Sequence, residues 1–80
     1  MSKPITLKHP VEFKGQTIET LEMRVPKVRD NIVASKAANH PADQELTLFA
    51  NLCEIEPAAL EEFHMADYSQ LQQVYNGFLS

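Results

Sequence analysis

Apolar and polar residues alternate at the start of the chain. The apolar positions of segment 4–13 all share odd parity, and they are Ile5, Leu7, Val11 and Phe13. This period of two predicts a strand from Pro4 to Phe13 with one buried face. Because Pro10 has no backbone donor, we expect the strand to lie at a sheet edge or to bend there.

A second strand is predicted from Thr17 to Val25, after a tight turn at Lys14-Gly15-Gln16. Gly15 supplies the positive φ that other residues resist. The apolar residues of this strand change parity between Ile18 and the later set of Leu21, Met23 and Val25. One extra residue would restore a common face, so we expect a β-bulge near Glu19-Thr20. The two strands predict a β-hairpin over residues 1–25.

Beyond Pro26 the apolar spacing becomes helical. A first helix should end at Asn39-His40-Pro41, since the residue before a proline avoids the α region. The apolar residues expected on its inner face are Val28, Ile32, Val33 and Ala37. A second helix is predicted from about Ala42 to Cys53, with an inner stripe of Leu46, Phe49, Leu52 and Cys53.

Two more helices complete the pattern. Glu56-Pro57 is typical of a helix start, and the short helix that follows offers Leu60 and Phe63 to a core. Asp67 is expected to cap the last helix, with Gln70 three residues later. The apolar side of that helix holds Tyr68, Leu71, Val74, Tyr75 and Phe78. The fold class is therefore α+β, a single domain over residues 1–80 in which a hairpin (1–25) precedes four short helices (26–80) packed on one of its faces.

Charge divides the chain into two halves. All seven basic residues lie between Lys3 and Lys36, whereas residues 41–80 carry seven acids and no base. Helices that enter a DNA groove usually carry Lys and Arg, so this distribution argues against nucleic-acid binding by the C-terminal half. No apolar run exceeds three residues, which excludes a transmembrane helix, and no secretory signal follows Met1. The single cysteine, Cys53, fits a reducing cytoplasm.

Catalytic or metal chemistry finds no support in the residue pattern. The three histidines (His9, His40 and His64) and Cys53 have no metal-motif spacing, and solvated or capping histidines are the ordinary alternative. Cys53 lies on an apolar stripe, where a small buried side chain is the usual role and a nucleophile the alternative. Glu61 and Glu62 are expected to form a solvated helix face. With two glycines in total there is no phosphate-binding loop, so we predict neither an enzyme nor a cofactor.

The aromatic stripe of the last helix has two interpretations. Tyr68, Leu71, Tyr75 and Phe78 recur at steps of three and four, and the opposite side carries glutamine and asparagine. The stripe could complete the core, or part of it could bind another chain as a helix does in a groove. We take these four residues as the candidate partner-binding residues.

The layout resembles the small tail assembly chaperones of Mu-like and P2-like phages. The segments that carry the resemblance are Ile5-Thr6-Leu7, Lys14-Gly15, Leu21–Pro26 with Asp30, and then Leu48–Leu60 and Met65-Ala66-Asp67-Tyr68. Relatives often have a Thr-Gly pair where this chain has Cys53-Glu54, a departure that affects a helix end. The resemblance covers nearly all 80 residues.

This resemblance implies a non-enzymatic role in the host bacterial cytoplasm. Such chaperones bind the long, helical tape measure protein, keep its apolar surfaces soluble, help to recruit tail tube subunits and are absent from the finished virion. Many relatives also make a longer product by translational frameshifting. The implied partners are the tape measure protein, the tail tube protein and a frameshifted longer form of the chain itself.

A nucleic-acid-binding regulatory module is the alternative function. It would use the basic residues of the N-terminal half, which are Lys3, Lys8, Lys14, Arg24, Lys27 and Arg29. Only Phe13 would offer the hairpin an aromatic ring for base stacking, whereas readers of single strands present several.

Overall fold

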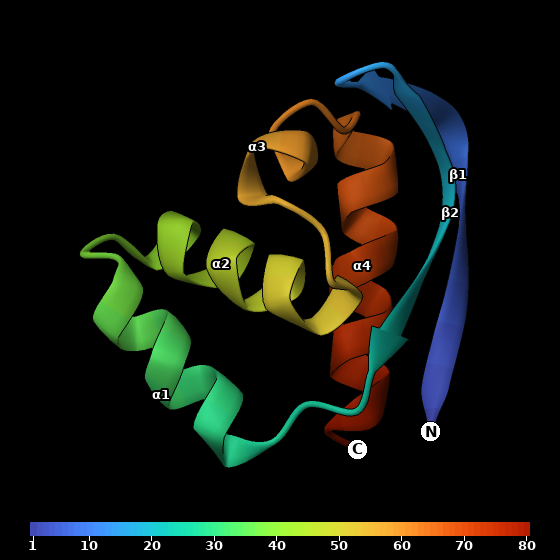
Figure 1. The fold of residues 1–80 in the computed structure, drawn as a ribbon. Helices are drawn as coiled ribbons and strands as arrows, with labels where there is room; N and C mark the ends of the chain where they lie inside the picture. Colours follow the sequence, from blue (N-terminus) through green and yellow to red (C-terminus); the bar gives the residue numbers. More distant parts are fainter.

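A computed structural model describes residues 1–80. A two-stranded antiparallel hairpin is followed by four helices, which confirms the predicted fold class. The elements are β1 (Ser2–Phe13), β2 (Gln16–Arg24), α1 (Val28–Ala37), α2 (Pro41–Cys53), α3 (Pro57–Leu60) and α4 (Met65–Phe78). In Figure 1, α4 lies along the curved hairpin, α2 crosses beside it, and α1 and α3 lie on opposite sides of α2. None of the helices is long and apolar enough to cross a membrane.

The hairpin turn forms where the sequence predicts it. Phe13 pairs with Gln16 across a two-residue loop. Gly15 has a φ of 79°, and Lys14 before it has a φ of 52°. Two successive positive φ angles give the turn a twist that matches the twist of the strands. The loop therefore fixes the register of the hairpin at its tip.

The predicted bulge near Glu19-Thr20 was assigned to the wrong strand. Thr6 pairs with Thr20 and Val11 pairs with Ile18, so Glu19 alone faces four residues of β1, positions 7–10. The extra residues thus lie in β1. The cause is tertiary, because the backbone N–H groups displaced there find an acceptor on α4, as described below.

Prolines and one left-handed residue set three of the helix boundaries. Pro41 and Pro57 lie in the first turns of α2 and α3, where the missing N–H costs no hydrogen bond. Glu54 ends α2 in the left-handed conformation with a φ of 55°. The last helix begins at Met65, so Asp67 is the third residue of α4 and not its cap as expected. The cap position belongs to His64, whose side chain makes no capping hydrogen bond.

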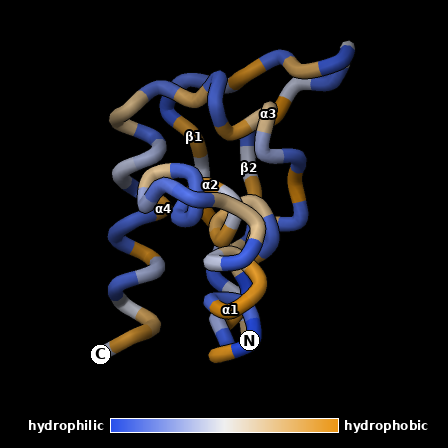
Figure 2. Tube along the Cα trace, turned by 90° about the vertical axis from the view of Figure 1, so that its left-hand side faces the viewer, coloured by the Kyte–Doolittle hydropathy of each residue, from blue (hydrophilic) through white to orange (hydrophobic).

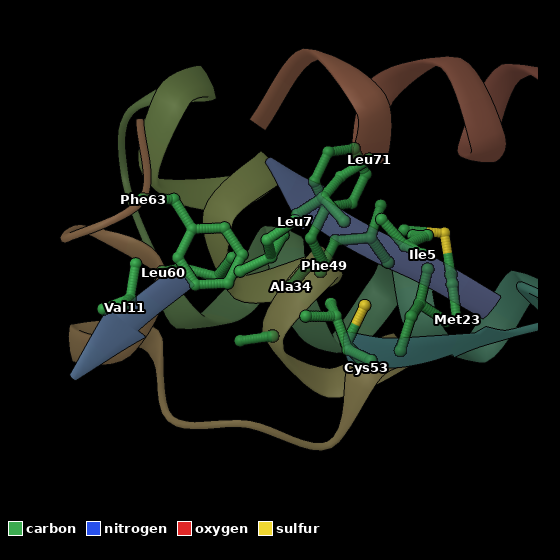
Figure 3. Packing of buried hydrophobic residues seen from close by; sticks show 14 residues of the cluster. Ile5, Leu7, Val11, Met23, Ala34, Phe49, Cys53, Leu60, Phe63 and Leu71 are labelled. Carbon is green, nitrogen blue, oxygen red and sulfur yellow. The ribbon is translucent and has the colours of Figure 1, made fainter. Parts of the chain in front are cut away.

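The core lies between the hairpin, α2 and α4. Figure 3 shows how apolar side chains from these elements meet around Phe49. The cluster comprises Ile5, Leu7, Val11, Leu21, Met23, Ala34, Leu48, Phe49, Ala50, Leu52, Cys53, Leu60, Phe63 and Leu71. Both strands contribute to it, so the hairpin has a buried face as predicted, but Phe13 and Val25, which were expected on that face, lie outside the cluster: Phe13 is half-buried and Val25 is 39% exposed.

The predicted inner face of α1 is wrong. Val28 is 78% exposed, Val33 53% and Ile32 48%, while Ala37 is also exposed. Only Asp30 and Ala34 of this helix are buried. The reason is the position of the helix: α1 packs on α2, and α2 and α4 already cover the hairpin. Figure 2 shows hydrophobic positions along α1 at the near side of the molecule.

Candidate functional site

The aromatic stripe of α4 divides between core and surface. Leu71 is completely buried, whereas Tyr68, Tyr75 and Phe78 are half-buried. The ring of Phe49 on α2 lies 5.6 Å from that of Tyr68 and 5.4 Å from that of Tyr75, both tilted. Such tilted pairs are a favoured geometry for aromatic rings. One side of the stripe thus holds α4 on α2, and the outer parts of the three aromatic rings remain exposed.

Polar contacts fix the two ends of the stripe. The Tyr68 hydroxyl donates to Glu45 Oε1 at 2.8 Å, and Gln72 Nε2 donates to the same oxygen at 3.1 Å. Burial and the neighbouring Glu45 raise the pKa of Tyr68, which remains protonated as a donor. At the other end, Lys3 Nζ lies 5.4 Å from the ring centre of Phe78. Phe78 is therefore covered partly by the flexible side chain of a lysine.

An exposed apolar face lies on α1, formed by Val28, Ile32 and Val33, and we call it the α1 face. Next to it is a cavity of about 300 Å³ between α1 and the C-terminal end of α4. We call this the α1–α4 groove, and its lining residues are Pro26, Lys27, Val28, Asn31, Tyr75 and Leu79. Leu79 is 63% exposed. The α1 face and the groove share Val28 and together form a strip in which apolar side chains alternate with the polar Lys27 and Asn31, and Tyr75 also belongs to it.

A second apolar hollow, of about 430 Å³, lies between α2, α3 and the start of α4. We call it the acidic groove, because its rim carries Asp43, Glu45 and Glu61 and no base. Its apolar lining comprises Ala42, Leu46, Leu60, Phe63, Met65 and Tyr68. Met65 is 74% exposed there. Sequence reasoning found Tyr68 but missed the groove, because its walls come from three helices.

Two buried carboxylates tie the helices to the hairpin. Asp67 accepts hydrogen bonds from the backbone N–H groups of Lys8 and His9 at 2.8 and 2.9 Å, and from the Gln70 amide at 2.9 Å. Burial acts to raise the pKa of the Asp67 carboxyl, but the hydrogen bonds outweigh it, so the pKa lies below its usual value. Asp67 thus satisfies the donors that the bulge of β1 removes from the ladder.

Asp30 occupies the same third position in α1. Arg24 at the end of β2 donates two hydrogen bonds to it, at 2.8 and 2.9 Å, and the backbone N–H of Lys27 donates a third at 2.8 Å. The bidentate contact with Arg24 holds the pKa of Asp30 below its usual range. Three basic residues, Arg24, Lys27 and Arg29, lie at the corner between β2 and α1, and of these Arg24 forms an internal ion pair.

Further basic residues of the N-terminal half have internal contacts. Lys14 pairs with Glu56 at 3.1 Å and lies over the ring of Phe13. Lys3 lies over the ring of Phe78, and Arg24 pairs with Asp30. All three cations are among the six basic residues that the nucleic-acid alternative would use. Three of the six residues named for that alternative are thus engaged within the chain. The two ion pairs, Lys14 with Glu56 and Arg24 with Asp30, lower the net positive charge that the hairpin offers to phosphate groups.

The candidate chemical groups are dispersed. His9 and His64 stack with ring centres 4.2 Å apart, but no cluster of three His, Cys, Asp or Glu residues could hold a metal ion. Cys53 is buried, and desolvation raises the pKa of its thiol to about 12. Because the thiolate is the nucleophile, a thiol with this pKa is unreactive near neutral pH. The surfaces, not the titratable groups, are the features that can recognise a partner.

Comparison with known proteins agrees with a role based on surfaces. No curated protein and no solved structure matches the chain. The family model described as "Phage tail assembly chaperone proteins, E, or 41 or 14" matches residues 4–80. This span includes both strands and all four helices apart from the first residues of β1. The chain therefore belongs to the phage tail assembly chaperone family.

Proposed function

We propose that this chain binds the tape measure protein of its phage and keeps it soluble in the host cytoplasm until the tail tube assembles. In this proposal it also helps to recruit tail tube subunits and leaves before the virion is complete. The membership of the family supports protein partners in tail assembly and a non-enzymatic role. The tape measure protein as the specific partner is our inference.

The observation that carries the proposal is the exposure of the α1 face. Val28, Ile32 and Val33 have the spacing of one side of a helix, yet all three lie in solvent. Covering apolar surface releases about 25 cal/mol per Å², so a partner that covers these side chains gains stability from the contact. A long helical protein can lay its own apolar stripe along such a strip, as in helix-in-groove recognition.

The α1–α4 groove extends this contact from α1 to the C-terminal end of α4. Tyr75 lines the groove from the α4 side, opposite Val28 and Asn31 on α1. Phe78 lies one turn beyond Tyr75, and Leu79 follows at the exposed end of the helix. We therefore place the predicted Tyr75 and Phe78 at the contact, while Leu71 supports it from the core. Tyrosine suits this position because it offers a large contact area with few rotors to immobilise.

Co-expression with the tape measure protein tests the proposal. The double variant Val28→Ser/Ile32→Ser should leave most of the tape measure protein insoluble and should not co-purify with the remainder. Val25→Ser is the control, because Val25 is an exposed apolar residue that lies outside the α1 face, the α1–α4 groove and the acidic groove. Wild-type capture by the double variant, at wild-type stability, would remove the α1 face from the site.

The aromatic residues of α4 provide a second arm of the same experiment. Tyr75→Ala and Phe78→Ala should weaken capture of the tape measure protein more than they lower the melting temperature. If both variants lose several degrees yet bind normally once folded, the stripe serves only the core. Retention of the wild-type chain on a nucleic-acid column with a steep salt dependence would instead favour the nucleic-acid alternative.

A further inference from the structure

The acidic groove has the chemistry of a docking site. Six of its ten lining residues are apolar, and three of the other four are carboxylates. Asp43 and Glu61 are exposed on the rim, and no basic residue occurs anywhere in residues 41–80 to neutralise them. An apolar hollow with a rim of one sign of charge favours an occupant that is apolar in the centre and basic at its edges.

Helix α1 of the same chain has that complementary chemistry. Two cations lie on the same exposed side of the helix as its apolar face: Arg29, one turn before Val33, and Lys36, one turn after Ile32. Both cations are exposed. The only acid of the helix, Asp30, is buried against Arg24 and so does not offset this charge at the surface.

The two surfaces cannot meet within one folded chain. Helix α1 lies on one side of α2, and α3, which forms a wall of the acidic groove, lies on the other side (Figure 1). The connection between α1 and α2 spans only residues 38–40, so α1 cannot swing across α2 without unfolding. An α1 face that enters an acidic groove must therefore come from another copy.

We propose that the α1 face of one copy docks into the acidic groove of a second copy. Val28, Ile32 and Val33 cover the apolar lining, while Arg29 and Lys36 face Asp43 and Glu61. The two patches differ, so the contact is head-to-tail, and a bound pair still offers one free α1 face and one free acidic groove, on different copies. The contact covers the same face as the proposed tape measure contact, so the two compete for α1.

Such a contact is weak and depends on salt. Exposed ion pairs each contribute little, and their attraction falls as the screening length shortens. Sedimentation velocity of the purified chain alone should show self-association that grows with protein concentration. The association should weaken several-fold between about 50 mM and about 500 mM NaCl, where the Debye length falls to a few ångströms. No tape measure protein is present, so the result is independent of the proposed function.

Charge reversal identifies the two surfaces. Asp43→Lys/Glu61→Lys makes the groove basic, and Arg29→Glu/Lys36→Glu makes the α1 flanks acidic. Each double variant alone should self-associate at least about tenfold more weakly than the wild type, because like charges then meet. An equimolar mixture of the two variants should associate again, since both mixed contacts pair opposite charges. Glu12→Lys/Glu19→Lys on the hairpin is the control with the same change in net charge as the groove variant, and it should behave as the wild type.

Three outcomes would overturn the proposal. The first is a wild-type chain that remains monomeric in low salt at high concentration. The second is a groove variant that self-associates as strongly as the wild type, which would indicate that α1 faces pair with each other. The third is a mixture that remains as dissociated as its components. Circular dichroism melts of every variant check that these exposed substitutions leave the fold intact.

Discussion

Helices α1 and α4 have similar apolar patterns, but the apolar face of α4 is largely buried and that of α1 is exposed. Both have apolar residues at steps of three and four, but Leu71 in α4 is completely buried while Val28 in α1 is 78% exposed. Helix α4 packs on the hairpin and sets two aromatic rings against Phe49 of α2, whereas α1 has α2 as its main neighbour. Periodicity thus determines which residues share a face, and neighbouring elements determine whether the face is covered.

A buried carboxylate attaches each helix to the rest of the chain, and we call Asp67 and Asp30 the anchors. They differ in how well they and their hydrogen-bond partners are buried. Asp67 in α4 is completely buried and accepts two backbone hydrogen bonds from β1. Asp30 in α1 accepts its bonds from Arg24, whose side chain is 40% exposed, and from the adjacent Lys27. Helix α4 is therefore part of the folding unit, and α1 is held at its periphery with a face free for partners.

The sharpest test of the comparison is a pair of truncations. Leu71→Ala should lower the free energy of unfolding by about 3 kcal/mol, because it leaves a cavity in the core. Ile32→Ala, on the α1 face, should change it by no more than about 0.5 kcal/mol. Urea unfolding followed by circular dichroism measures both. Equal losses would mean that the two helices are equally integrated.

The anchors provide the next largest effect. Asp67→Ala should cost about 2 kcal/mol of stability, because the N–H groups of Lys8 and His9 lose their acceptor in a partly buried site. Asp30→Ala should cost less, since Arg24 can turn into solvent. Chemical denaturation of both variants checks the order, with Glu62→Ala as an exposed carboxylate control. A larger loss for Asp30→Ala would reverse the ranking of the anchors.

Replacement of the cysteine in α2, the helix that contacts both α1 and α4, should have an intermediate effect on stability. Cys53→Ala should cost about 1–2 kcal/mol through lost packing and leave partner binding per folded molecule unchanged. The native thiol should alkylate slowly at neutral pH, because its pKa is about 12. Rapid alkylation by iodoacetamide, or a fully stable variant without function, would indicate a reactive role.

Acid should act through the same two anchors. The pKa values of Asp67 and Asp30 are lower in the folded chain than their unfolded values near 4. Their contribution to stability is thus complete above the unfolded pKa and is lost as the pH falls through the folded pKa. Urea midpoints measured from about pH 6 to about pH 2 should fall less for Asp67→Ala than for the wild type, since that variant lacks one of the titrating groups. Parallel curves would show that Asp67 does not contribute to the acid response.

The sequence alone determined the elements of this protein and the composition of most faces. Alternation predicted both strands, Gly15 predicted the turn, Pro41 predicted the end of the first helix and Pro57 the start of the third, because these signals act through local backbone geometry. The apolar stripe of α4 was also recognised from spacing alone. The chemistry of the candidate surfaces can also be read from the sequence. Apolar and basic residues occur together in α1, and the C-terminal half carries acids and no base.

Only the tertiary structure decided which faces are covered and where the hairpin bends. The bulge lies in β1 because Asp67, 58 residues after His9, accepts the displaced donors. The sequence pattern predicts a helix cap at Asp67 because an acid near a helix start gives the same pattern in two cases. It can bind the backbone of its own helix, or it can bind a strand that is remote in sequence. The α1 face lies in solvent because α2 and α4 already cover the hairpin, and burial depends on such long-range packing and not on the pattern of one segment.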